Sequence, residues 1–205
     1  MIKDNAKRPI LVAITGASGL LYAQTFLEQL DKLNQKIHLI VSENAKKVIE
    51  IEGFDISNLN IDYLFDAKDI CAPPASGSTD YSSMVILPCS MNTVAAISCG
   101  ITLNLIHRAA DCFLKQKRTL IICPRETPLS GIHLKNMLKL SNEGAIIFPL
   151  MPAFYQGPKT IKELVYNLTA RIIDCLGLKV KDVKDWQEIY KNKKIQRGYE
   201  GDKKD

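Results

Sequence analysis

The sequence predicts an α/β protein in which a doubly wound parallel sheet is covered by helices on both faces, giving three layers in a single domain. Short runs of apolar, mainly β-branched residues recur along the chain without polar alternation, which is typical of strands buried on both faces. A segment with helical spacing of apolar residues follows nearly every run. The chain has 205 residues, of which 46% are hydrophobic, so it is long enough to bury one such core.

The expected elements alternate along the chain. A strand at 10–14 is followed by a glycine turn and by a helix whose apolar positions run from Leu20 to Leu33. Further apolar runs predict strands at 37–41, 84–87, 119–123 and 145–148, and helical spacing predicts helices over about 44–51, 91–99, 105–117, 133–141 and 160–176. Ligands of parallel sheets bind at the carboxyl ends of the strands, so functional residues are expected there. The domain is expected to span 1–178, with a charged tail at 179–205.

Composition narrows the class of protein. The net charge is +5, and no stripe of arginines and aromatic residues accompanies the basic tail, which argues against nucleic-acid binding. The first apolar run is too short for a signal peptide, and no stretch approaches the roughly 20 apolar residues of a membrane span. Six cysteines without a C-x-x-C pair suggest buried free thiols and no metal site. A cytoplasmic protein is expected.

The glycine turn after the first strand is a candidate anion site. Gly16 and Gly19 permit a tight turn, after which the backbone N–H groups of residues 17–20 are expected to point outward beside the Ser18 hydroxyl. A simple capped turn explains a lone G-x-x-G equally well. The dinucleotide fingerprint is incomplete, since the second strand ends at Ser42 rather than at an acidic residue. A monophosphate therefore fits better than a dinucleotide.

Other polar residues follow the later strands. Ser90, Asn92 and Thr93 open a helix, where they could be caps or, together with Ser18 and Ser42, could surround one polar cofactor. Arg125 can be interpreted either as a surface residue or as an anion clamp. Glu52 and Glu143 are by default solvated carboxylates. Tyr155, in a proline-bounded loop, and Arg171, on the last helix, are ordinary when taken singly.

Taken together, several segments carry a recognisable pattern. The stretches "TGASG", "APPASGS", "PCSMNT", "NLIHRAADCFLK", "CPRETPLSGIHLKNMLKLSNEGA" and "PAFYQGPKTIKELV" occur in this order. They resemble UbiX-type flavin prenyltransferases. The resemblance implies a flavodoxin-like (Rossmann-like) homo-oligomer, typically a dodecamer, that binds reduced FMN and a dimethylallyl phosphate without a metal ion. It implies prenyl transfer to N5 and C6 of the flavin, giving the prenylated FMN that a UbiD-type decarboxylase uses, for example in ubiquinone biosynthesis.

The resemblance also implies roles for individual residues. Matching the family's flavin contacts are Gly16, Ala17, Ser18, Ser42, Ser90, Met91, Asn92, Thr93 and Arg125. Tyr155 and Arg171 match its prenyl-phosphate contacts, which suits the charge left on a departing phosphate. Ser18, Glu52 and Glu143 match its catalytic group, in which a carboxylate or the departing phosphate takes the proton leaving flavin C6. Burial is expected to raise the pKa of such a glutamate.

One departure and two alternatives remain. Some members carry a tryptophan where this chain has Asp69-Ile70-Cys71, so the aromatic wall over the prenyl group is expected from Phe154, Tyr155 or another subunit. The choice between a monophosphate and a pyrophosphate donor stays open, as does prenyl chain length.

An FMN-dependent cysteine decarboxylase of the same fold group would carry "PASANT" in place of Pro74–Ser78. A non-catalytic FMN-binding regulatory protein would not need Glu52, Tyr155 and Arg171.

Overall fold

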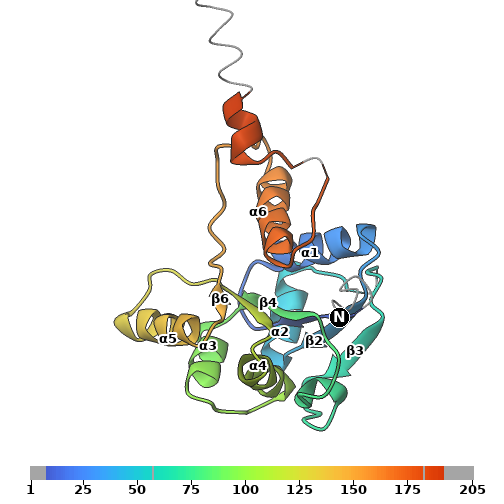
Figure 1. Cartoon of the computed structure of the whole chain (residues 1–205), viewed down its shortest axis with the longest axis vertical. Helices are drawn as coiled ribbons and strands as arrows, with labels where there is room; N and C mark the ends of the chain where they lie inside the picture. The colour runs from blue at the N-terminus through green and yellow to red at the C-terminus, as the bar shows by residue number, and fades with distance from the viewer. Residues whose placement is uncertain (1–7, 57, 182, 192–205) are drawn as a thin grey trace, which may run out of the picture.

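The described part of the chain forms one parallel sheet (Figure 1). In a computed structural model that describes residues 8–56, 58–181 and 183–191, six strands pair in the order β3-β2-β1-β4-β5-β6. The strands are β1 (Ile10–Ile14), β2 (Ile37–Val41), β3 (Tyr63–Asp66), β4 (Ser83–Cys89), β5 (Thr119–Pro124) and β6 (Ile146–Ile147). Every neighbouring pair is parallel. The predicted doubly wound α/β class is confirmed.

Helices cover both faces of the sheet. They are α1 (Leu20–Lys32), α2 (Glu43–Glu52), α3 (Met91–Ser98), α4 (Leu105–Lys115), α5 (Gly131–Asn142) and α6 (Ile161–Cys175), with a 3-10 turn, η2, at Pro73–Ala75. One apolar cluster joins the sheet to α1, α2 and α6, and a second joins its other face to α3, α4 and α5. Two of the expected helices begin slightly earlier than the apolar spacing indicates, at Glu43 and Gly131.

Burial on both faces explains why the strands lack polar alternation. All five residues of β1 are at most 2% exposed. Leu11 and Ala13 face the cluster of α3, α4 and α5, whereas Ile10, Val12 and Ile14 face that of α1, α2 and α6. Because both faces are covered, each position favours an apolar residue and the period of two disappears.

The edges of the sheet differ from the expectation. β3 was not predicted: it has four residues at the sheet edge, of which Phe65 alone is buried, so its sequence carries no apolar run. At the other edge, β6 covers only two of the four residues expected at 145–148. The order of all six strands matches that of the dinucleotide-binding folds. If the short edge strand β3 is left out, the order of the other five matches that of flavodoxin. In both cases the order reverses between β1 and β4, which places the crevice for a ligand there.

Two further observations concern composition. The six cysteines are free, but Cys71, Cys99 and Cys175 are exposed, so the expectation of buried thiols holds only for the other three. Across the described residues, no helix is long and apolar enough to cross a membrane.

Candidate active site

The loops after β1 and β4 are tied together at the point where the strand order reverses. Thr15 follows β1 and is 1% exposed; its Oγ1 donates to the Pro88 carbonyl at 3.0 Å. The same oxygen accepts from the Ser90 N–H at 2.7 Å. Sequence reasoning missed Thr15, although it precedes the glycine turn directly. Its hydroxyl sets the spacing of the two loops that border the crevice.

Gly16 is needed because α2 approaches the turn. A Cβ at Gly16 would lie 2.6 Å from the Asn44 Cβ, closer than side chains tolerate. Ser42, the residue before α2, donates its N–H to the Ile14 carbonyl at 3.0 Å and accepts the Ala45 N–H on its Oγ at 3.1 Å. Gly16, Ala17 and Ser42 therefore lie together at the carboxyl ends of β1 and β2, as predicted.

The anion at the start of α1 is a carboxylate of the chain itself. Glu52, the last residue of α2, accepts the Gly19 N–H at 3.0 Å and the Leu20 N–H at 2.9 Å. It is also hydrogen-bonded to the Ser18 side chain. The Ala17 N–H turns back to the Thr15 carbonyl at 2.7 Å instead of pointing outward. The expected phosphate site at the N–H groups of 17–20 is thus occupied by Glu52, whose charge the helix dipole favours.

These bonds decide the protonation state of Glu52. Partial burial raises the pKa of its carboxyl, but hydrogen bonds from Ser18, Leu20 and Gly19, together with the charge of Arg125, outweigh burial and lower the pKa below 4.5. The expectation of a raised pKa was wrong for Glu52. It assumed an apolar environment, whereas the groups around this carboxylate donate hydrogen bonds that stabilise its ionised form. At neutral pH Glu52 is ionised and can accept a proton.

Arg125 joins this cluster from β5. Its backbone N–H donates to the Cys89 carbonyl at 3.2 Å, and its side-chain Nε donates to the Ser18 carbonyl at 3.1 Å. One arginine thus links the end of β4 to the glycine turn. Because the guanidinium carries further N–H donors, it can also bind an anion.

The polar residues after β4 have unequal environments. Ser90 is the N-cap of α3: its Oγ accepts the Thr93 N–H at 3.3 Å and lies 3.1 Å from the Thr93 Oγ1. Met91 and Thr93 are buried, whereas Asn92 is exposed. The capping interpretation is therefore correct for Ser90, and Asn92 presents its amide at the carboxyl edge of the sheet.

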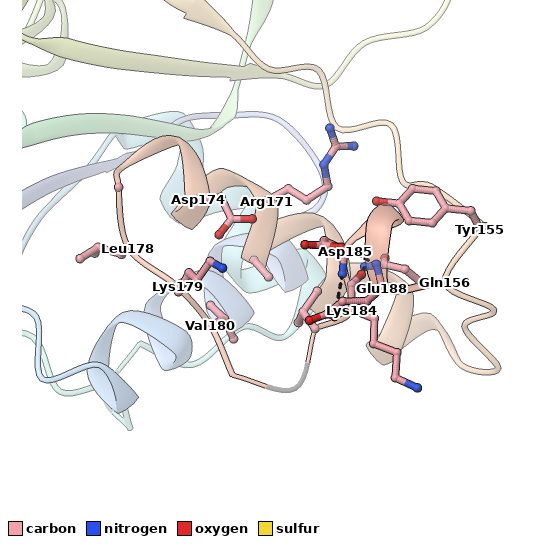
Figure 2. A pocket seen from close by; sticks show the side chains of 13 residues that line it. Tyr155, Gln156, Arg171, Asp174, Leu178, Lys179, Val180, Lys184, Asp185 and Glu188 are labelled. Atoms are coloured by element: carbon pink, nitrogen blue, oxygen red, sulfur yellow. Dashed lines mark hydrogen bonds between the residues drawn. The ribbon is translucent and has the colours of Figure 1, made fainter. Parts of the chain in front are cut away.

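Tyr155 and Arg171 line a cavity of about 920 Å³ (Figure 2). Its walls come from the segment after β6, from α6 and from residues 177–180, 183–185 and 188. The Arg171 guanidinium lies 6.0 Å from the centre of the Phe148 ring. Figure 2 shows this guanidinium on the same side of the cavity as the Tyr155 hydroxyl. The sequence-predicted pair is thus brought together.

The end of β6 connects this cavity to the sheet. The Phe148 N–H donates to the Ile122 carbonyl at 2.8 Å, and the Leu150 N–H donates to the Pro124 carbonyl at 3.2 Å. Because Arg171 lies beside Phe148, it is placed at the carboxyl end of β6. β6 pairs with β5, the strand that Arg125 follows. Among the described residues, no hydrogen bond or ion pair joins Tyr155 or Arg171 directly to Glu52 or Ser18.

Glu143 lies away from both groups. It caps the carboxyl end of α5 and borders a cavity of about 200 Å³ together with Lys117 and Arg118, which precede β5. This is the amino edge of the sheet, opposite to Ser18 and Glu52. Within one chain, Glu143 does not join the catalytic group in which the sequence placed it.

Comparison with known proteins identifies the family. The model of the Flavoprotein family matches residues 2–174. The flavin prenyltransferase UbiX of Methanocaldococcus jannaschii is 45% identical over 184 residues, which cover 88% of this chain and 99% of the relative. The chain belongs to the UbiX family of flavin prenyltransferases. The resemblance noted in the sequence is confirmed.

Solved structures of UbiX proteins share the fold. AnUbiX (PadA1), in complex with FMN and dimethylallyl pyrophosphate, matches with a TM-score of 0.85 and 41% identity over 88% of this chain and 97% of that one. A dodecameric FMN-dependent UbiX-like decarboxylase from Escherichia coli O157:H7 matches with a TM-score of 0.81 and 38% identity, covering 87% and 98%. The peptidyl-cysteine decarboxylase EpiD is only 18% identical, at a TM-score of 0.54 over 72% of this chain and 82% of that one, so its likeness to this chain shows the fold alone.

Proposed function

We propose that this UbiX-family chain transfers the dimethylallyl group of a dimethylallyl phosphate to N5 and C6 of reduced FMN, producing prenylated FMN. The observation that carries the proposal is the hydrogen-bonded group of Ser18, Glu52 and Arg125 beside the β1–β4 crevice. This group combines an ionised proton acceptor with a cation at the place where doubly wound sheets bind ligands. Relatives named as flavin prenyltransferases support the same reaction.

The donors around the crevice fit the polar groups of FMN. The Ser42 hydroxyl accepts a backbone N–H and can donate its own proton to a ligand. The Ser90 hydroxyl accepts a backbone N–H and shares a hydrogen bond with the Thr93 hydroxyl, so one of these two hydroxyl protons stays available to a ligand. Arg125 supplies a cation at the same edge. We assign to flavin binding Gly16, Ala17, Ser18, Ser42, Ser90, Met91, Asn92, Thr93 and Arg125. Reduced FMN, when bound, supplies the nucleophilic N5 and C6 atoms of the reaction.

Glu52 and Ser18 are proposed as the proton-handling pair. A proton must leave flavin C6 as the new ring closes, and an ionised carboxylate in hydrogen-bond contact with a hydroxyl can accept it directly or through that hydroxyl. The departing phosphate is the competing acceptor. Arg125 holds the Ser18 carbonyl and thereby orients the turn that carries the hydroxyl.

Tyr155 and Arg171 are proposed to bind the prenyl phosphate. Breaking the allylic C–O bond leaves negative charge on phosphate oxygens, which a guanidinium and a phenol stabilise by hydrogen bonds. The 920 Å³ cavity they share is large enough for a small phosphate ester. Both monophosphate and pyrophosphate donors are consistent with these two groups.

A homo-oligomer completes the proposal. On α5, Ile132, Leu134 and Leu138 are 70%, 53% and 63% exposed, an unusual share of large apolar side chains for one helix. Figure 1 shows α5 projecting from the side of the molecule. We propose that these residues contact neighbouring copies in a dodecamer, and that Glu143, at the end of the same helix, acts in a neighbouring copy's site.

We also propose that the prenylated FMN is delivered to a UbiD-type decarboxylase. Activation of such a decarboxylase therefore tests the proposed function. The protein is incubated without oxygen with reduced FMN and dimethylallyl monophosphate, and the released flavin is given to an apo UbiD-type decarboxylase. We expect decarboxylation to appear, whereas reduced FMN without the prenyl donor restores none. Authentic prenylated FMN serves as the positive control. If that control activates the decarboxylase and the enzymatic product does not, the proposed function is wrong.

A further inference from the structure

The ring of Tyr155 packs against Trp186, the chain's single tryptophan. The ring centres are 5.4 Å apart and the planes meet at 87°, an edge-to-face arrangement that stabilises aromatic pairs. Trp186 belongs to residues 183–191, which we call the C-terminal strap. The sequence placed these residues in a charged tail without a function. In the structure they form part of the wall around Tyr155 and Arg171.

A second contact attaches the strap to the same loop. The Gln156 side-chain Nε2 donates to the Lys184 carbonyl at 2.9 Å, and these residues lie one position after Tyr155 and two before Trp186 (Figure 2). Asp185 and Glu188 cap each other: the Glu188 N–H donates to Asp185 Oδ1 at 2.8 Å, and the Asp185 N–H donates to Glu188 Oε2 at 3.3 Å. These bonds cap the start of the helical residues 186–191, of which Trp186 is the first.

The loop itself offers Tyr155 little support. Its neighbours Phe154 and Met151 are 74% and 67% exposed, so they do not anchor the loop in the core. The Gly157 N–H donates to the Phe154 carbonyl at 2.9 Å, which closes the turn of the backbone but does not touch the Tyr155 ring. Trp186 is therefore the aromatic surface that limits how the Tyr155 ring rotates.

We infer that Trp186 is a positioning residue for the prenyl donor: it holds the Tyr155 ring so that the hydroxyl lies on the Arg171 side of the cavity. The strap then forms the outer wall of the pocket for a phosphate ester of a short allylic alcohol. This inference rests on the proposed roles of Tyr155 and Arg171.

Steady-state kinetics of three variants test the inference. For Trp186→Ala we expect KM for dimethylallyl monophosphate to rise about tenfold, the loss that corresponds to one hydrogen bond to a charged group, with kcat and FMN affinity little changed. Trp186→Phe should restore KM to within about twofold, because an edge-to-face pair can re-form. Tyr190→Ala is the matched control, because Tyr190 is an aromatic residue of the strap with an exposure of 55% against 61% for Trp186, and it should behave as wild type. Equal KM values for Trp186→Ala and Tyr190→Ala would overturn the inference.

Tryptophan fluorescence provides a readout that does not depend on turnover. Because Trp186 is the single tryptophan, its emission reports on the strap alone. Titration of the purified protein with dimethylallyl monophosphate should give a saturable change in emission, and Tyr155→Ala should abolish it. If the wild type prenylates FMN but its emission does not respond to the donor, the strap inference fails and the proposed function stands. If the wild type makes no prenylated flavin, both fail.

Discussion

Glu52 is a carboxylate whose ionised form is stabilised by the fold. Hydrogen bonds from Ser18, Leu20 and Gly19 place its pKa in the folded state below the ordinary value of 4.5. A carboxyl with a depressed folded pKa adds stability at pH values above its unfolded pKa, and this contribution disappears as pH falls through the folded pKa. The pH dependence of stability therefore reports on the contacts that define the site.

We predict that Glu52→Gln lowers the melting temperature at pH 7 and that the difference from wild type narrows as pH falls below 4.5. Thermal unfolding at fixed protein concentration across this pH range measures both. Glu50→Gln, an exposed carboxylate on the same helix, is the matched control and should leave the melting temperature unchanged. A difference that persists unchanged at acidic pH would contradict the assignment of a lowered pKa to Glu52.

At the scale of elements, the site depends on how two loops are joined. Thr15 links the carboxyl ends of β1 and β4: its buried Oγ1 bonds both the Pro88 carbonyl and the Ser90 N–H, and its backbone N–H also donates to the Pro88 carbonyl at 3.2 Å. Replacement by valine keeps the shape but removes the acceptor of the Ser90 N–H, while the Pro88 carbonyl keeps only the backbone N–H of residue 15 as its donor. Buried groups that lose their hydrogen bonds cost more than the bond itself contributes.

We predict that Thr15→Val lowers the free energy of unfolding by about 1–3 kcal/mol, the penalty for an unsatisfied buried polar group, and weakens FMN binding. Urea unfolding and FMN titration measure the two effects. Thr25→Val is the matched control, since the Thr25 Oγ1 only donates to the Leu21 carbonyl within α1. It should change the unfolding free energy by no more than about 0.5 kcal/mol. Equal losses of unfolding free energy and of FMN affinity in both variants would contradict the role given to the Thr15 link between the two loops.

The elements show what the sequence could and could not predict. β1, β2, β4 and β5 were predictable because burial on both faces makes their residues apolar, whereas β3 carries one buried residue and no such signal. Ser42 and Ser90 were found because they follow strands directly, and Gly16 because a glycine turn lies between β1 and the next helix. The bonds of Glu52 to Gly19 and Leu20 were not, because they join residues more than 30 positions apart through side-chain geometry alone. Trp186 was missed for the same reason: nothing local to residue 186 indicates Tyr155.

For the whole molecule, α5 combines a proposed contact surface with a proposed catalytic residue. Its exposed apolar side chains include Ile132, Leu134 and Leu138, and Glu143 follows directly at its carboxyl end. Within one chain Glu143 lies at the sheet edge opposite to Glu52. If the assembly brings Glu143 to another copy's site, assembly and turnover are linked.

We predict that Leu138→Glu breaks the oligomer into smaller species, because a charge would be buried in an apolar contact, and that turnover falls with it. Sedimentation and mass measurement in solution determine the size, and flavin turnover is followed on the same samples. Lys135→Gln, an exposed polar position on the same helix, is the control and should leave both unchanged. A dissociated Leu138→Glu protein with full turnover would contradict the role of Glu143 across subunits.

The central claim concerns a single covalent change in the flavin. The most direct measurement is mass spectrometry of the flavin released after anaerobic incubation of the protein with reduced FMN and dimethylallyl monophosphate, repeated with the pyrophosphate. We predict a flavin heavier than FMN by one C5H8 unit with at least one of the two donors. Unmodified FMN with both donors would contradict prenyl transfer by this protein.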